Sequence, residues 1–181
     1  AILTLTIIYF ITLDEMKDAQ KLKDNIYISD KVKTPAVYGI IKPKIILPTE
    51  YDVNKLNFIL MHEKAHIKRK DNFIRLLALI VVCFHWFNPF AWLMLKLLYS
   101  DIELACDESV LSKCDEAERK EYAYTLLSTA EKTNLFVASF GGSKIRIRIE
   151  NILSYSKISI FSIVSFAALV IAMCYVLLTN A

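Results

Sequence analysis

Residues that interrupt regular structure are scarce in this sequence, which has three Gly and four Pro among 181 residues. This scarcity argues against many tight turns and favours long helices. The four Cys form no C-x-x-C pair, so we expect reduced, structural thiols at Cys83, Cys106, Cys114 and Cys174. The net charge of +3 is too small to indicate a nucleic-acid partner, and we expect no direct contact with nucleic acid.

Apolar residues, in contrast, are abundant, at 55% with a mean hydropathy of +0.40. A chain of 181 residues supports one domain of ordinary size plus membrane elements. All Lys and Arg lie between Lys17 and Lys157, so the positive-inside tendency places this central segment on the cytoplasmic side of a membrane. The chain starts without Met and inside an apolar run, so we expect a fragment of a longer protein.

Both ends of the chain are candidates for membrane segments. Ile158 to Thr179 is uncharged for 22 residues, which at helical rise is roughly 33 Å, close to the bilayer core of about 30 Å. We therefore predict a transmembrane helix at 157–179. Residues 1–13 are too few to span a bilayer. We interpret them as the end of a truncated transmembrane helix, or else as a buried amphipathic helix. The predicted cytoplasmic domain is 14–156.

The fold class predicted for this domain is mainly α with a small β-sheet (α+β). Residues 14–23 are charged and compatible with a helix, whereas three short runs predict strands at Asn25–Asp30, Ala36–Ile41 and Lys44–Leu47. Residues 76–100 are strongly apolar and predict a membrane-associated helical hairpin with its bend near Asn88–Pro89. Further helices are expected at 101–112 and 113–132, and a loop at 134–142. Residues 143–153 alternate in a way that fits either a strand or a helix.

The most informative pattern is His62-Glu63-Lys64-Ala65-His66, an H-E-x-x-H motif. The run from Val53 to Arg69 has no Gly or Pro and predicts a helix. Imidazoles four residues apart then share one helix face and can bind one Zn²⁺. Glu63 lies beside them, where it can reach a water on the metal and not the metal itself.

A catalytic zinc site needs a third protein ligand, and Glu103 is the candidate. Asp107 lies one helical turn later, where it can accept the second ring N–H of a ligand histidine. The alternative is that both acids are solvated surface charges. Cys106 is a rival ligand. His85 could be a fourth ligand or a proton carrier, but is more simply a polar group at the hairpin bend.

Taken together, these motifs resemble the BlaR/MecR-type membrane zinc metalloproteases. The resemblance covers about Pro35 to Leu111 and rests on the H-E-x-x-H motif together with Thr34–Gly39, Pro43–Pro48, Lys68–Asp71, His85–Pro89 and Glu103-x-x-Cys106-Asp107-x-x-Val110. It implies a gluzincin-like peptidase domain flanked by transmembrane helices in a multi-pass protein of the bacterial cell membrane, facing the cytoplasm. Members of this family couple an extracellular sensor domain to cleavage of a transcriptional repressor, or of themselves, in antibiotic resistance.

The expected activity is zinc-dependent peptide hydrolysis with Glu63 as general base. Candidates for stabilising the oxyanion are Tyr122, Tyr124 and His85. An extended substrate could pair with a sheet edge at Val37–Ile41 or at Lys44–Leu47. Two alternatives stay open. One is a non-proteolytic signalling relay that binds zinc structurally or not at all, and the other is a membrane zinc protease for protein quality control.

Overall fold

The computed structural model describes residues 17–131, 145–156 and 168–170. The predicted end of a transmembrane helix at 1–13 and the loop at 134–142 lie outside these ranges, as does nearly all of 157–179. Within the described ranges, none of the helices combines the length and apolar character that crossing a bilayer requires. The two membrane segments at the ends of the chain therefore stay predictions.

A small four-stranded sheet precedes the helices. Its strands are β1 (Gln20–Lys23), β2 (Ile26–Ser29), β3 (Ala36–Tyr38) and β4 (Lys44–Pro48). The spatial order is β1-β2-β4-β3, with β2 and β4 parallel and the other pairs antiparallel. The interior strand β4 buries Ile45, Ile46 and Leu47 completely or nearly so. This arrangement confirms a small sheet and makes β3 one of its edges.

The helical prediction for 14–23 is wrong at β1. Gln20–Lys23 pairs antiparallel with β2 across a turn at Asp24 and Asn25, and Asp24 has a φ of +46°. Asp and Asn are the residues that best tolerate such a turn conformation. The predicted strand at Ala36–Ile41 is also shorter than expected, because Gly39 leaves the strand with a φ of +89°.

The motif helix is α2 (Leu56–Arg69), which follows a 3₁₀ turn η1 (Val53–Lys55). The Asp52 carboxylate accepts a hydrogen bond from the Asn54 N–H at 3.0 Å and begins this segment. The predicted helix at 53–69 is thus confirmed, with a tighter first turn. At its other end Lys70 has a left-handed φ of +58°, and α3 (Asp71–Phe84) starts at the next residue.

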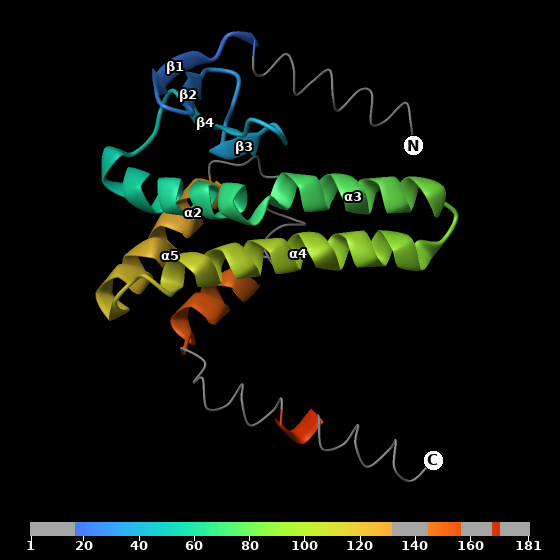
Figure 1. Cartoon of the computed structure of the whole chain (residues 1–181). Coiled ribbons are helices and arrows are strands. Elements are labelled where there is room, and N and C mark those ends of the chain that lie inside the picture. The colour runs from blue at the N-terminus through green and yellow to red at the C-terminus, as the bar shows by residue number, and fades with distance from the viewer. Residues whose placement is uncertain (1–16, 132–144, 157–167, 171–181) are drawn as a thin grey trace, which may run out of the picture.

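Two long helices lie side by side in Figure 1. Helix α3 runs on from α2, and α4 (Pro89–Leu111) returns antiparallel beneath both. The bend falls at 85–88, and the Asn88 side chain accepts from the Phe90 N–H at 2.9 Å to begin α4. The helical hairpin and its bend are confirmed, whereas its association with a membrane stays a prediction. The predicted helical conformation of 101–112 is confirmed up to Leu111, but this segment is the continuation of α4 and not a separate helix.

Helix α5 (Glu116–Glu131) and a helix at 145–153 complete the described fold. Asp115 and Glu118 form a reciprocal capping box at the start of α5. The open choice between strand and helix resolves as a helix at 145–153, the part of this run that the structure describes. A core of Phe58, Val110, Leu111, Cys114, Tyr122, Ala123 and Ile152 joins α2, α4, α5 and this last helix. The buried face of α2 is thereby held against α4.

Candidate metal and peptidase site

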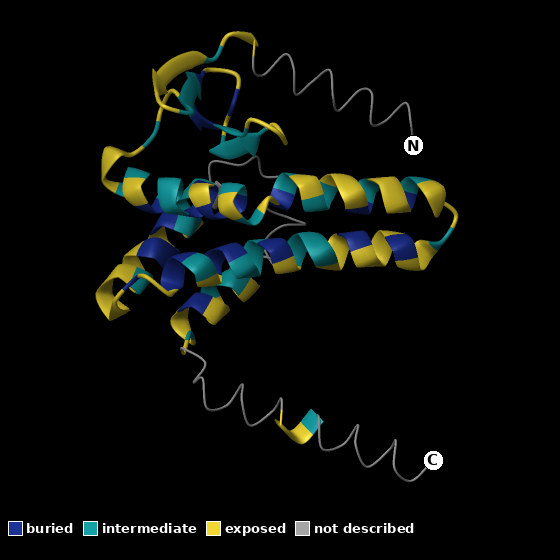
Figure 2. Cartoon of the chain, in the orientation of Figure 1, coloured by how far each residue is buried: buried dark blue, intermediate teal, exposed yellow. Residues whose placement is uncertain are grey.

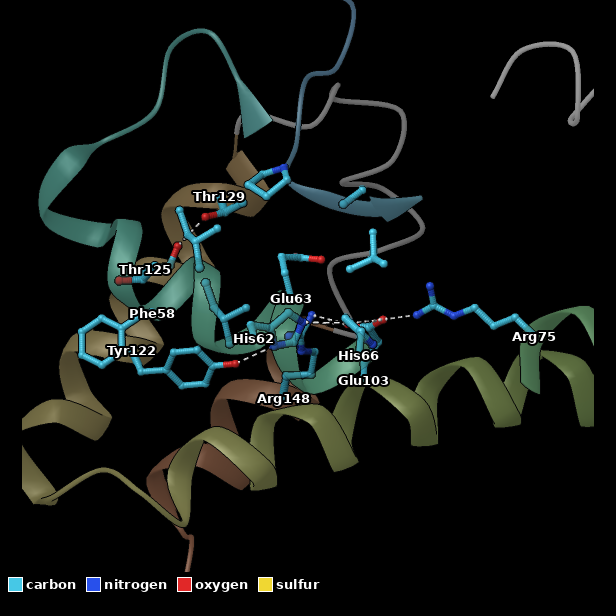
Figure 3. Close-up of a pocket in the computed structure, with 15 residues that line it drawn as sticks. Phe58, His62, Glu63, His66, Arg75, Glu103, Tyr122, Thr125, Thr129 and Arg148 are labelled. Carbon is cyan, nitrogen blue, oxygen red and sulfur yellow. Dashed lines mark hydrogen bonds and ion pairs between the residues drawn. The ribbon is translucent and has the colours of Figure 1, made fainter. Parts of the chain in front are cut away.

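The H-E-x-x-H motif lies on the buried face of α2. His62, Glu63 and His66 are all buried, and the Nε2 atoms of the two imidazoles are 3.2 Å apart. Figure 3 shows Glu63 projecting from α2 into the hollow beside this pair. The helical spacing therefore brings the two rings to one point, as the sequence predicted.

Helix α4 brings Glu103 to the same point. Its Oε2 lies 3.5 Å from His62 Nε2, and its Oε1 lies 3.7 Å from His66 Nε2. These potential ligand atoms all lie within 4.8 Å of one another. Four ligands arranged tetrahedrally around Zn²⁺ at ordinary bond lengths are about 3.3 Å apart. The observed spacings fit a zinc ion with little rearrangement.

The outer nitrogens of both imidazoles are held by hydrogen bonds. The Tyr122 hydroxyl donates to Asp107 Oδ1 at 2.6 Å and so accepts from His62 Nδ1 at 2.8 Å. His66 Nδ1 donates to Asp71 Oδ2 at 2.7 Å. With protons on both Nδ1 atoms, both Nε2 atoms can offer lone pairs to a metal. Asp107 therefore lies near its predicted place but contacts His62 mainly through Tyr122, since its own distance to His62 Nδ1 is 3.4 Å.

Charges around the histidines favour a cation between them. Burial lowers the pKa of His62, but its contacts with Asp107 and Glu103 outweigh burial and raise that pKa to about 9. Burial and the neighbouring charge of His62 lower the pKa of His66. One positive charge is thus favoured on the pair, and a metal ion can take the place of that proton.

Glu63 has the environment of a general base. Burial raises its pKa, while the charge of His62 opposes that shift. A carboxylate with a raised pKa is a stronger proton acceptor than an ordinary one. Its side chain is close to the metal ligands and lines the hollow next to them.

Two arginines that no sequence motif indicates also belong to the site. Arg148, from the helix at 145–153, lies 3.2 Å from Glu103 Oε2, and Arg75 Nη2 donates to Glu103 Oε1 at 2.8 Å. Burial raises the pKa of Glu103, but His62 and Arg148 outweigh it and lower that pKa to about 2. Arg148 was visible in the sequence only as part of the alternating run at 143–153.

Asp71 and Cys106 lie behind His66, on the side away from Glu103. Asp71 is fully buried at the start of α3, and the Cys106 Sγ lies 3.1 Å from His66 Nδ1 and 3.4 Å from Asp71 Oδ2. Burial and the Asp71 carboxylate raise the pKa of the Cys106 thiol, which keeps it protonated. Cys106 thus lies next to Nδ1 of His66, whereas Nε2 of the same ring faces His62. Its role as a rival ligand at the shared point is not supported by this geometry.

The three oxyanion candidates have different positions. Tyr122 lines the hollow, but its hydroxyl is engaged by His62 and Asp107. Tyr124 is 71% exposed on α5, and neither it nor His85 is among the residues that line the hollow. His85 is exposed at the end of α3, where its backbone N–H donates to the Val81 carbonyl at 3.0 Å. The simpler interpretation of His85 as a group at the bend fits this position.

The hollow at the site has a volume of about 230 Å³ and lies between α2 and the sheet edge. Ala36 and Val37 of β3 form one wall, opposite Glu63. Of the two predicted edges, only the segment at Val37 lies on an edge strand of the described sheet, because β4 is paired on both sides. The alternative edge at Lys44–Leu47 is therefore excluded. The Val37 carbonyl accepts a hydrogen bond from the Asn72 side chain at 3.0 Å.

Comparison with known proteins assigns this architecture to a class. The sequence model of the BlaR1 peptidase M56 family matches residues 10–152, and the chain belongs to this family. Membership indicates a metallopeptidase, and it confirms the resemblance to BlaR/MecR-type peptidases found in the sequence.

Individual relatives agree with the family. The chain is 31% identical over 117 residues to the regulatory protein BlaR1 of Bacillus licheniformis, covering 61% of this chain and 20% of that protein. It is 28% identical over 103 residues to the methicillin resistance mecR1 protein of Staphylococcus aureus, covering 55% and 18%. With BlaR1 of Staphylococcus aureus it shares 25% identity over 175 residues, covering 87% and 30%. The chain thus spans a fifth to a third of the length of these relatives.

Proposed function

We propose that this chain is the zinc metalloendopeptidase domain of a membrane signal transducer. The proposed ligands are His62, His66 and Glu103, and the proposed general base is Glu63. The observation that carries this function is the convergence of two Nε2 atoms and the Glu103 carboxylate on one point, with Glu63 beside it in a hollow. A purely structural zinc site has no use for a buried carboxylate next to its ligands.

The chain's own residues supply the remaining parts of hydrolysis. When bound, zinc supplies Lewis acidity, which activates water and polarises the scissile carbonyl. Glu63 takes the proton from the attacking water and delivers it to the leaving amine. Tyr122 and Asp71 keep the Nδ1 protons of the histidines in place, so that the rings cannot turn away.

The substrate is a cytoplasmic protein segment in an extended conformation. Support comes from β3, which is an edge strand of the described sheet and lines the hollow at Ala36 and Val37. The Val37 carbonyl accepts from the Asn72 side chain at 3.0 Å, so an added strand takes the place of that contact. The names of the relatives, a regulatory protein and a methicillin resistance protein, support a substrate in a signalling pathway. A transcriptional repressor, or this protein itself, fits that role.

The test is the metal content of detergent-purified chain, measured by mass spectrometry. We expect about one zinc per chain in the wild type and in Glu63→Gln, and little in Glu103→Ala. Glu63→Gln also abolishes peptide hydrolysis, because the amide cannot accept the water proton. The control is Glu108→Ala, which removes an exposed carboxylate from the same helix and should leave the zinc content unchanged.

Two results would contradict the proposal. Absence of zinc from the wild type would remove the peptidase function and leave a signalling relay. Undiminished hydrolysis by Glu63→Gln would exclude Glu63 as the base.

A further inference from the structure

Arg148 joins the last described helix of the domain to the proposed metal site. Its side chain is 15% exposed, whereas that of Arg146 on the same helix is 80% exposed and pairs with Glu150. The helix at 145–153 is anchored independently by Ile152 in the main core and by the Tyr155 carbonyl, which accepts from Arg119 at 3.2 Å. Arg148 is thus not needed merely to attach this helix.

The guanidinium of Arg148 contacts two carboxylates of the site, those of Asp107 and Glu103. Its Nε and Nη2 donate to the two oxygens of Asp107, each at 2.7 Å, and its Nη1 lies 3.2 Å from Glu103 Oε2. A forked contact of this kind fixes the plane of a carboxylate as well as its position. Figure 3 shows Arg148 directly beside His62.

Asp107 passes this constraint on to the metal ligands. Its Oδ1 accepts from Tyr122, whose hydroxyl is 2.8 Å from His62 Nδ1. Arg148 is therefore linked to His62 by two hydrogen-bonded groups and to Glu103 directly.

We propose that Arg148 is a positioning residue for the metal site, so that the metal affinity of the domain depends on the docking of the helix at 145–153. This inference rests on the ligand set of the proposed function. It adds a residue 41 positions beyond Asp107 in the chain, which no ligand motif contains. It also makes the segment after α5 part of the working site.

Electrostatics alone predicts the opposite effect of removing Arg148. A guanidinium near the ligands repels a divalent cation, so loss of its charge should tighten metal binding. Loss of positioning should weaken it, because residues that orient metal ligands typically contribute 10- to 100-fold in affinity. The direction of the change in Kd therefore distinguishes the two effects.

The experiment is titration of metal-depleted full-length chain in detergent with Zn²⁺ and with Co²⁺. The variants are Arg148→Met, which removes the charge, and Arg148→Lys, which keeps the charge and loses the fork. Arg146→Met is the matched control. We expect the zinc Kd to rise roughly 10- to 100-fold in both Arg148 variants, and not in the control. The visible absorption of the Co²⁺ form should change as well, because it reports the coordination geometry.

Each outcome decides something. If the wild type binds neither metal, the proposed function fails, and this inference fails with it. If the wild type binds metal but both Arg148 variants match Arg146→Met in Kd and in the Co²⁺ spectrum, only this inference is overturned. Circular dichroism checks folding, and if Arg148→Met is unfolded, Arg148→Lys decides alone.

Discussion

Each nitrogen that is proposed to bind the metal has a partner at the other nitrogen of the same ring. For His62 that partner is the Tyr122 hydroxyl, and for His66 it is the Asp71 carboxylate. Asp71 is held in turn by Arg69, whose Nε donates at 3.3 Å. The two rings thus have unlike supports, a hydroxyl at His62 and a carboxylate at His66, and each support fixes the orientation of its ring.

This difference gives a prediction for Asp71. Asp71→Asn removes the negative charge next to the ring and should weaken zinc binding about 10- to 100-fold, as expected for such supporting groups. The measurement is the zinc Kd by competition with a chelating dye. Asp101→Asn on α4 is the control, because Asp101 is exposed. An unchanged Kd in Asp71→Asn would show that the Asp71 contact does not serve metal binding.

At the scale of single residues, the sequence indicates the proposed ligands and one supporting residue, Asp107, but not the other supports. His62, Glu63 and His66 follow from helical spacing alone, and Glu103 follows from the need for a third ligand. Arg148 could not be predicted, because the alternating run around it fits two kinds of structure and because no spacing rule joins it to Asp107. The sequence of α5 favours an inward position for both Tyr122 and Tyr124, but only Tyr122 is buried, and Tyr124 is exposed. The partners of the Tyr122 hydroxyl depend on how α5 packs.

Lys70, at the junction between α2 and α3, has a left-handed backbone conformation that is unfavourable for a residue with a side chain. Lys70 has a φ of +58° and its N–H donates to carbonyls of the last turn of α2. A side chain costs about 1–2 kcal/mol in this region, and helices commonly end there with Gly. The junction must hold this conformation because the next residue is Asp71, which contacts His66.

Lys70→Gly should therefore stabilise the protein. After subtraction of the greater freedom of Gly in the unfolded chain, we expect a gain of up to about 1 kcal/mol in the free energy of unfolding. Lys68→Gly is the matched control, since Lys68 lies within α2 and is exposed. Lys68→Gly should lower the free energy of unfolding by about 1 kcal/mol. Chemical denaturation measures both, and a loss of stability in Lys70→Gly would contradict the argument.

Sequence patterns did not indicate two features of the fold, the strand β1 and the continuity of α4. Gln20–Lys23 contains two lysines and only one apolar residue, Leu22, and all four residues are exposed. Nothing in this pattern predicts a strand, which forms by hydrogen bonding to β2. The continuity of α4 through residue 100 was missed because the apolar run ends there. A helix needs a breaker or a cap to end, and neither is present.

The whole molecule has two ends of different character. Buried residues gather around the site, whereas the far end of α3 and α4 is largely exposed in Figure 2. The small core inside this hairpin is Ala78, Val82, Ala91 and Leu95, while Phe84, Trp86, Phe87 and Phe90 lie on its outside, each more than 60% exposed. An apolar surface of this kind at a hairpin end fits insertion into a bilayer.

The two tryptophans of the chain report on this surface. Both lie at the hairpin end, with Trp86 65% and Trp92 51% exposed. Trp92 donates its ring N–H to the Trp86 carbonyl at 2.9 Å, which leaves no donor to solvate on that ring. In vesicles of brominated lipid we expect strong quenching of tryptophan fluorescence and little quenching by iodide in water. The reverse pattern would place the hairpin outside the membrane.

The site residues also appear in a fixed order as the chain is made. His62, Glu63 and His66 leave the ribosome first, Glu103 follows, and Arg148 comes 45 residues after Glu103. At 5–20 residues per second, that interval is roughly 2–9 s. If Arg148 completes the site, a nascent chain holds its own base and both histidines through this interval without an assembled peptidase. The distant position of Arg148 then delays full metal affinity until the segment that carries Arg148 has been synthesised and has docked on the site.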